Sequence, residues 1–315
     1  MKVGVIGTGH MGQNHVQTYL AMNDVCQLVG IYDDDKQTKR DVAEYYRVQS
    51  FQSVDDLLGS VDAVSIAVPT ERHYAIGLAC VRRNVHMLME KPLTNTVAEA
   101  DDLIAKAHAK GVKLQTGHIE LYNPFIQVLL ELLESESIIG MSCHRVSPEE
   151  SRLQNVNVVT DLMIHDIYIF NEWFSDSTLD FAAVGQVSGD TPKHAAVVLR
   201  TSQGETAQLT SSFMAGRKVR SIRILTKNGM IEADILHKEI NVTRTFTEKT
   251  GQDPIPVSQT IQVGDAAQPL YLQLRDFLSC LKSDSEPSVT GEDGRRALAM
   301  ANQITDAIVS RSTYH

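Results

Sequence analysis

The chain has 315 residues, of which 43% are hydrophobic, and its formal net charge is -10. This length and apolar content favour two domains with well-packed cores. The negative charge opposes attraction to phosphate backbones, and no apolar run approaches the roughly 18 residues of a membrane span, so we expect neither nucleic-acid nor membrane binding.

Along the first 120 residues, short apolar runs rich in β-branched residues alternate with longer helical patterns. The runs predict strands at residues 2–6, 26–32, 63–68, 85–89 and 113–117. Such alternation is typical of a parallel sheet with helices on both faces. Thr96 and Glu99 form a capping box at the start of one helix, which Gly111 ends. We therefore predict an N-terminal α/β domain over residues 1–120, a doubly wound Rossmann sheet.

A glycine-rich turn follows the first predicted strand. Gly7, Gly9 and Gly12 make the pattern G-x-G-x-x-G, which allows a tight turn, close approach of a pyrophosphate and packing of the next helix. The spacing alone is weak evidence, because purely structural turns share it. Its place between strand and helix favours a dinucleotide on the helix N-terminus. The candidate cofactor-binding residues of this turn are Gly7, Thr8, Gly9, His10, Met11 and Gly12.

A carboxylate ends the second predicted strand. Asp33 stands about 20 residues after the last glycine, where it can accept hydrogen bonds from both ribose hydroxyls. With Asp34 and Asp35 beside it and no arginine directly there, a 2′-phosphate would be repelled. NAD is therefore favoured over NADP, and a solvated turn residue is the alternative interpretation of Asp33.

The segment MEKPLTNT, residues 89–96, places a charge pair and a proline directly after the fourth apolar run. Ligands of an open parallel sheet bind beyond the carboxyl ends of the strands, and Lys91 stands at such an end. Pro92 restricts the backbone of the residue before it, and Glu90 can pair with the ammonium, so the direction of Lys91 is constrained. The Lys91–Pro92 bond is a candidate for the cis form, which about 5 to 6% of X–Pro bonds adopt. A solvated charge pair is the alternative.

From about residue 121 the pattern changes to stretches of period two separated by turn residues. They predict strands at residues 195–200, 205–213, 221–226, 230–236 and 239–246. Helices are expected at residues 124–134, 162–173, 268–281 and 292–310. Residues 247–268 are expected to form a long surface connection that contains a short strand at 258–263. We therefore predict a C-terminal α+β domain over residues 121–315, built on a large, mostly antiparallel open sheet.

The stretch VVTDLMIHDIYIF, residues 158–170, sets two polar side chains in an apolar helix. Asp161 and His165 are four residues apart, which puts them on one face. A carboxylate beside an imidazole fixes its tautomer and supports its charged form, as a general base near neutral pH requires. A histidine satisfied within the core is the alternative.

The four cysteines are scattered without a C-x-x-C pair, which speaks against a zinc site or a disulfide framework. We expect buried, reduced thiols and no metal. The N-terminus has neither a charged leader nor a cleavage site, so a soluble, cytoplasmic protein is expected.

The sequence resembles the oxidoreductase family of glucose-fructose oxidoreductase, inositol dehydrogenase and rhizopine catabolism, called Gfo/Idh/MocA. The resemblance runs nearly end to end through VGVIGTGHMGQNH, AVSIAVPTERH, MEKPLTNTVAEADDLI, TGHIELYNP, TDLMIHDIYI and EPSVTGEDGRRALAMA. It implies catalytic roles for Lys91, Asp161 and His165, and a nicotinamide side lined by Pro69, Thr70 and His73, with Glu90 and Lys91 also at the cofactor. The substrate-binding residues that it implies are Lys91, His118, Tyr122, Arg145, Asp161 and His165. It further implies a homodimer or homotetramer formed through the C-terminal sheet.

Within that family, GHIELYNP, DLMIHDI and SSFMAGRKVRSIRI look most like the UDP-N-acetylglucosamine 3-dehydrogenase branch, which oxidises the sugar C3 hydroxyl to a ketone. That branch usually has Arg where this chain has Leu121, which removes one plausible partner for the substrate or for Glu120 and leaves the exact sugar open. A group of basic residues could bind a diphosphate or simply form the solvated face of a strand: Arg217, Lys218, Arg220 and Arg223.

We predict an NAD-dependent oxidoreductase that converts a secondary ring hydroxyl of a small sugar or nucleotide sugar to a ketone. His165 takes the hydroxyl proton, Asp161 supports it, and Lys91 stabilises the negative charge that grows on oxygen. An inositol or free-sugar dehydrogenase is the alternative within the same chemistry. A non-catalytic dinucleotide-binding sensor or scaffold is the alternative from another class.

Overall fold

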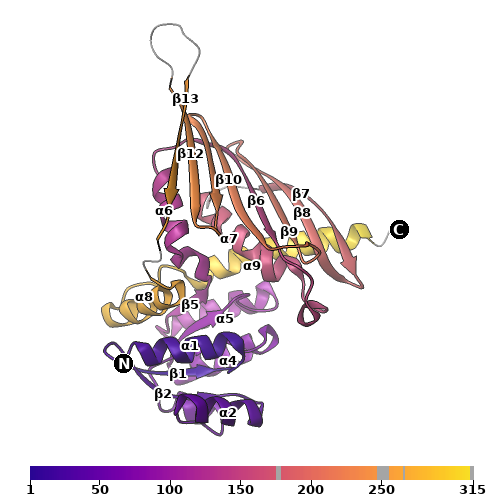
Figure 1. Ribbon diagram of the computed structural model, residues 1–315. Coiled ribbons are helices and arrows are strands. Elements are labelled where there is room, and N and C mark those ends of the chain that lie inside the picture. The colour runs from indigo at the N-terminus through magenta and orange to yellow at the C-terminus, as the bar shows by residue number, and fades with distance from the viewer. Residues whose placement is uncertain (175–178, 247–254, 265–266, 313–315) are drawn as a thin grey trace. The chain divides into compact units, whose positions relative to one another are not determined.

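The computed structural model describes residues 1–174, 179–246, 255–264 and 267–312 (Figure 1). The chain divides into two compact units: unit 1 comprises residues 1–122 and 267–299, and unit 2 comprises residues 123–266 and 300–315. Residues 267–299 thus pack with the N-terminal unit, whereas the sequence analysis grouped them with the C-terminal domain. That residues 1–120 and 121–315 form separately folding domains stays a prediction.

Unit 1 is built on a five-stranded parallel sheet in the order β2-β1-β3-β4-β5. The strands are β1 (Lys2–Ile6), β2 (Gln27–Tyr32), β3 (Ala63–Ile66), β4 (His86–Glu90) and β5 (Leu114–Gly117). All five predicted strands are confirmed. The helices and 3-10 turns of this unit are α1 (His10–Ala21), α2 (Lys36–Tyr46), α3 (Val54–Leu58), η1 (Thr70–Arg72), α4 (His73–Arg83), α5 (Val97–Ala109), η2 (Ile119–Tyr122), α8 (Pro269–Ser283) and the first part of α9 (Gly291–Ser312).

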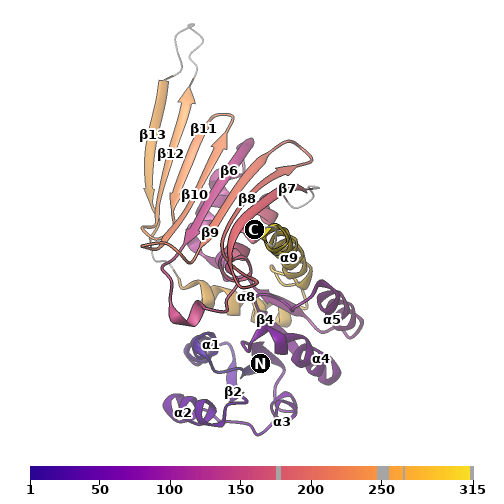
Figure 2. The ribbon, with the colours of Figure 1, turned by 90° about the vertical axis from the view of Figure 1, so that its right-hand side faces the viewer.

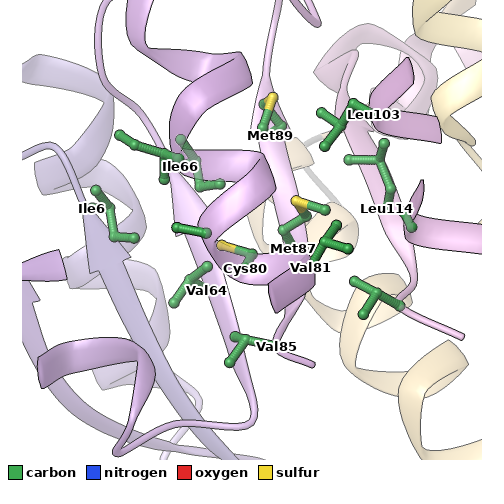
Figure 3. Packing of buried hydrophobic residues seen from close by; sticks show 14 of the residues in the cluster. Ile6, Val64, Ile66, Cys80, Val81, Val85, Met87, Met89, Leu103 and Leu114 are labelled. Carbon is green, nitrogen blue, oxygen red and sulfur yellow. The ribbon is translucent and has the colours of Figure 1, made fainter. Parts of the chain in front are cut away.

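Apolar cores cover both faces of this sheet. Val3 and Val5 of β1 face a core with α1 and α8, whereas Ile6 faces a core with α3, α4 and α5. In Figure 3, Val64 of β3 lies beside Cys80 of α4 on the second face. Burial on both sides explains why these strands are nearly continuous apolar runs.

The predicted capping box at the start of α5 is present. The Thr96 hydroxyl accepts a hydrogen bond from the Glu99 N–H at 3.2 Å, and the Glu99 carboxylate accepts one from the Thr96 N–H at 3.2 Å. Gly111 has φ of +65°, which confirms the predicted left-handed stop.

Unit 2 is built on an eight-stranded sheet in the order β13-β12-β11-β10-β6-β9-β8-β7, with β6 near the middle in Figure 2. Its strands are β6 (Ile138–Val146), β7 (Leu179–Ser188), β8 (Thr191–Thr201), β9 (Thr206–Ser212), β10 (Val219–Thr226), β11 (Gly229–Asp234), β12 (Glu239–Phe246) and β13 (Ile255–Gln262). β6 and β9 are parallel, and their other neighbours pair antiparallel. The predicted fold class is therefore confirmed.

Two strands of unit 2, β6 and β7, were not predicted from the sequence. The predicted short strand is longer than expected, since β13 begins at Ile255, and the predicted connection lies partly outside the described residues, at 247–254 and 265–266. The remaining helices are α6 (Pro124–Leu133), η3 (Ser151–Leu153), the π-helix η4 (Val159–Met163), α7 (Ile164–Trp173) and the later part of α9.

One face of the eight-stranded sheet is buried. On β8, Ala195, Val197 and Leu199 are buried, whereas Val198 and Arg200 between them are exposed. The π-helix η4 packs against β6 and β9. The four cysteines are buried as free thiols, as predicted, and no helix in the described part of the chain is long and apolar enough to cross a membrane.

Candidate active site

The glycine turn of unit 1 combines close packing with open space. A Cβ on Gly7, whose φ is +89°, would lie 2.5 Å from the Ala67 carbonyl oxygen, and one on Gly12 would lie 1.8 Å from the Gly7 oxygen. These two glycines let β1 and α1 cross closely. A Cβ on Gly9 would meet nothing within 4 Å in the described residues. Gly9 also has no side chain to cap α1, so the first N–H groups of α1 are available to an anion.

Asp33, which directly follows β2, holds the glycine turn by hydrogen bonds. Its Oδ2 accepts hydrogen bonds from the Thr8 N–H at 2.6 Å and the Thr8 hydroxyl at 2.9 Å, and its Oδ1 accepts one from the Asp35 N–H at 2.9 Å. Asp33 and Gly9 line a cavity of about 400 Å³ that also reaches Pro69. Contacts of Thr8, His10, Met11 and Asp33 with a cofactor stay predictions.

The same cavity contains an arginine that the sequence analysis missed. Arg72 of η1 forms an ion pair with Asp34, which also accepts a hydrogen bond from the Tyr32 hydroxyl at 2.7 Å. The Tyr32 hydroxyl and the Arg72 charge lower the pKa of the Asp34 carboxyl. The segment between β3 and α4 thus brings an arginine to the end of β2, next to the acidic run Asp33–Asp35.

Lys91 follows β4 at the carboxyl edge of the sheet and is partly buried. The Lys91–Pro92 bond is cis, as considered from the sequence. Glu90 is 8% exposed; its Oε1 lies 3.0 Å from His15 Nε2, and its Oε2 accepts a hydrogen bond from the Lys91 N–H at 3.3 Å. His15 was not predicted as the partner of Glu90, because the two residues are far apart in the sequence.

His118 follows β5 at the same edge and is buried. Burial, helped by the Lys91 charge, lowers the pKa of His118 to about 3, so its imidazole is neutral at physiological pH. The Tyr122 hydroxyl donates to Asp276 at 2.6 Å and accepts from the Gln115 amide at 3.0 Å, which ties η2 to α8. Substrate binding by His118 and Tyr122 stays a prediction.

His73 connects two loops of the same edge. Its Nδ1 lies 2.9 Å from the Pro92 carbonyl oxygen, its Nε2 lies 2.9 Å from that of Val68, and burial lowers its pKa. His73 therefore braces the segment after Lys91 against the loop after β3. Pro69 lines the cavity and Thr70 begins η1. The roles of Pro69, Thr70 and His73 at the nicotinamide stay predictions.

Asp161 and His165 lie in unit 2. The helix predicted at residues 162–173 is in the structure a π-helix followed directly by an α-helix. Asp161 is in η4 and His165 in the first turn of α7, and both are partly exposed. Asn157 holds the start of this segment: its side-chain oxygen accepts a hydrogen bond from the Val159 N–H at 2.9 Å, and its carbonyl accepts one from the Asp161 N–H at 3.0 Å. Partial exposure fits a functional histidine better than one satisfied in the core. Their catalytic roles stay predictions.

Arg145 lies inside unit 2. It is 1% exposed, and its Nε and Nη2 atoms each lie 2.9 Å from Oδ1 of Asp166, which is 2% exposed. This buried ion pair joins β6 to α7 at the residue next to His165. Substrate binding by Arg145 stays a prediction, and the observed contact gives it a positioning role.

The basic residues around β10 do not share one face. Arg220 is in register with the buried Arg145, whereas Arg223 is exposed on the other face and pairs with Glu232 at 2.8 Å. Arg217 and Lys218 are exposed ahead of the strand. Arg223 therefore fits the solvated-face alternative, and the strand separates it from Arg220.

Uncapped N–H groups at a helix start, open space over Gly9 and a carboxylate-lined cavity at the carboxyl edge of a parallel sheet fit a dinucleotide. They define unit 1 as a Rossmann-type dinucleotide-binding unit. Among the described residues, no group of three or more His, Cys, Asp or Glu is arranged to hold a metal ion.

The NAD-binding Rossmann domain of the Gfo/Idh/MocA oxidoreductases matches residues 1–118, and the C-terminal alpha/beta domain of the same family matches residues 149–314. The chain therefore belongs to the Gfo/Idh/MocA oxidoreductase family, which confirms the resemblance and the predicted NAD cofactor. The protein is an NAD-dependent dehydrogenase.

Named dehydrogenases are among the relatives that match almost the whole chain. UDP-N-acetylglucosamine 3-dehydrogenase from Acidithiobacillus ferrooxidans is 32% identical, over 98% of this chain and 97% of the relative. A solved structure of that enzyme has a TM-score of 0.91 at 30% identity and covers 98% of both chains. Myo-inositol 2-dehydrogenase from Thermotoga maritima is 29% identical, over 95% of this chain and 94% of the relative.

Proposed function

We propose that the protein oxidises a secondary ring hydroxyl of a nucleotide sugar to a ketone. The substrate is UDP-N-acetylglucosamine, and the group oxidised is its C3 hydroxyl. The observation that carries the oxidation is that Lys91 follows β4 at the edge where the glycine turn and Asp33 form the cofactor cavity. The near full-length relative named UDP-N-acetylglucosamine 3-dehydrogenase supports the choice of sugar.

In this proposal the chain's own residues bind, orient and move a proton. The N–H groups at the start of α1 hold the pyrophosphate, and Asp33 accepts hydrogen bonds from the ribose hydroxyls. NAD, when bound, supplies the acceptor for the hydride that leaves the alcohol carbon. His165 takes the hydroxyl proton with Asp161 as its support, and the Lys91 ammonium stabilises the developing oxyanion.

The myo-inositol relative favours a second candidate, an inositol or free-sugar dehydrogenase. Both candidates use the same proton and hydride transfers and differ in how the substrate is recognised. The exposed Arg217 and Lys218 and the half-buried Arg220 are the candidate contacts for a diphosphate, whereas Arg223 pairs with Glu232. Their contribution separates the candidates, because an inositol has no diphosphate to bind.

A substrate panel tests the proposal. The protein is incubated with NAD and UDP-N-acetylglucosamine, other UDP-sugars, free hexoses or inositols while NADH absorbance is followed. We expect the highest kcat/KM with UDP-N-acetylglucosamine and a 3-keto product by NMR. Turnover of inositols or free hexoses alone would establish the second candidate, and turnover of none of these compounds would overturn both.

We further propose that the protein is cytoplasmic and forms a homodimer or homotetramer through the open face of the eight-stranded sheet. Val184, Val198 and Leu225 on this face are 56%, 58% and 48% exposed. Burying such side chains against a second copy is favourable, and four buried free thiols suit a reducing compartment. Light scattering of wild type and Val198→Asp tests the assembly, and a monomeric wild type would contradict it.

A further inference from the structure

A chain of buried polar side chains runs through unit 1 from α1 to the residue before Lys91. The Tyr19 hydroxyl lies 2.9 Å from Ser65 Oγ, Ser65 Oγ lies 2.9 Å from His15 Nδ1, and His15 Nε2 lies 3.0 Å from Glu90 Oε1. Tyr19, Ser65 and His15 are at most 1% exposed. The family match and the predicted catalytic residues leave these contacts without a role.

Hydrogen-bond chemistry gives this chain a direction. Burial raises the pKa of Tyr19 well above its usual value, so its hydroxyl keeps its proton and donates to Ser65. The Ser65 proton then points to His15 Nδ1, which accepts it, and the imidazole carries its own proton on Nε2. That N–H donates to the Glu90 carboxylate. A neutral His15 and an ionised Glu90 thus give every donor an acceptor. A protonated His15 would instead donate from Nδ1 to Ser65, and either the Ser65 or the Tyr19 hydroxyl would then lack an acceptor among these side chains.

The Glu90 carboxylate is confined on its other side by β5. Glu90 is in register with Gly117, where a Cβ would lie 2.8 Å from Glu90 Cα and 2.9 Å from its Oε2. Gly117 therefore leaves the space that the carboxylate occupies. With Oε1 on His15 and Oε2 on the Lys91 N–H, Glu90 is held in one orientation.

We propose that His15 is a positioning residue, which directs Lys91 towards the reacting oxygen by holding the Glu90 carboxylate. The inference rests on the proposed function, because Lys91 acts there on the substrate. His15 belongs to α1, the helix whose N-terminus forms the cofactor site. One helix thereby carries the cofactor site at its start and orients the catalytic lysine from its second turn.

Substitutions of His15 test the inference through a separation of kcat from binding. His15→Leu removes both hydrogen bonds at similar size and should lower kcat about tenfold or more, with KM for the sugar and Kd for NADH within about twofold. His15→Gln, whose amide can donate to Glu90, should restore most of kcat. Ser65→Ala, which leaves the imidazole in place but removes its anchor, should cause a smaller loss.

His86→Leu is the matched control. His86 lies at the opposite end of β4 from Glu90, is half-buried and accepts a hydrogen bond from the Lys113 N–H at 3.0 Å. Its substitution should leave kcat unchanged. A kcat for His15→Leu equal to wild type, or an equal loss in His86→Leu, would overturn the positioning role.

A readout that does not require turnover separates this inference from the proposed function. In the ligand-free protein, 15N NMR of His15 should show the neutral imidazole with its proton on Nε2. A doubly protonated ring, or the Nδ1–H tautomer, would overturn the directed chain. If wild type turns over no sugar, the proposed function fails. The His15 tautomer still decides whether the hydrogen-bonded series from Tyr19 to Glu90 runs in the proposed direction.

Discussion

The two sheets present their functional residues in different ways. In unit 1, all strands are parallel, and a candidate residue follows four of them at one edge: Gly7 after β1, Asp33 after β2, Lys91 after β4 and His118 after β5. In unit 2, most strands are antiparallel, and Asp161 and His165 lie on helices packed on the sheet. A parallel sheet gathers strand ends at one edge, so position in the sequence indicates function.

In the antiparallel sheet, strand ends alternate between two edges, and position indicates much less. The orientation of His165 depends instead on what holds α7. Buried apolar residues of α7 and the buried pair between Arg145 and Asp166 both hold this helix. The comparison therefore predicts that losing a charge at the site of unit 1 lowers turnover but hardly changes the stability of the fold. Losing the charge that supports α7 in unit 2 should lower the stability.

The largest expected effect is that of Arg145→Met. Removing the arginine takes the cationic partner away from the buried Asp166 carboxylate, which should lower the free energy of unfolding of the protein by about 3–5 kcal/mol. Urea denaturation measures this loss. The double variant Arg145→Met with Asp166→Leu removes both charges and should recover most of the stability.

An unchanged unfolding midpoint for Arg145→Met, together with a raised KM for the sugar, would show that Arg145 is a substrate ligand after all. The difference between units 1 and 2 would then be smaller than the burial of Arg145 indicates.

The second prediction concerns Lys91 in unit 1. Lys91→Met should lower kcat by about a hundredfold or more, because the developing oxyanion loses a stabilising charge. Stability and NADH affinity should change little, since Lys91 is partly exposed at the strand end. Stopped-flow kinetics and calorimetric titration with NADH measure the two quantities. Unchanged turnover would remove Lys91 from the mechanism.

Sequence reasoning recovered unit 1 better than unit 2 for physical reasons. Strands buried on both faces are continuous apolar runs, so all five of them could be read locally. β6 was missed because it carries polar residues on both faces, including Arg145, which is buried in an ion pair with Asp166 of α7. The partners His15 for Glu90 and Arg72 for Asp34 were missed because each pair joins separate elements. Local spacing contains no information about such pairs.

The third prediction concerns Arg72 and the preference of unit 1 for NAD over NADP. In Asp34→Asn, Arg72 loses its anionic partner and becomes available to a 2′-phosphate. A charge-assisted hydrogen bond of this kind should raise kcat/KM for NADP about tenfold relative to NAD. Steady-state kinetics with both cofactors measure the ratio.

Asp35→Asn is the control for Asp34→Asn, because it removes the same charge from the neighbouring residue, which caps α2 by accepting from the Thr38 N–H at 2.6 Å. An equal gain in Asp35→Asn would attribute the effect to net charge. Adding Arg72→Leu to Asp34→Asn should abolish the gain.

The smallest expected effect belongs to the feature that the sequence makes most plain. Thr96→Ala removes the hydroxyl that caps α5 and should lower the free energy of unfolding by about 1 kcal/mol without changing kcat. Thr96→Ser keeps the hydroxyl and should be nearly neutral. Hydrogen exchange of the first turn of α5 reports the loss directly. A loss as large as that of Arg145→Met would mean that local and long-range contacts are equally important here, which the burial of the two sites contradicts, since Thr96 is exposed and Arg145 is not.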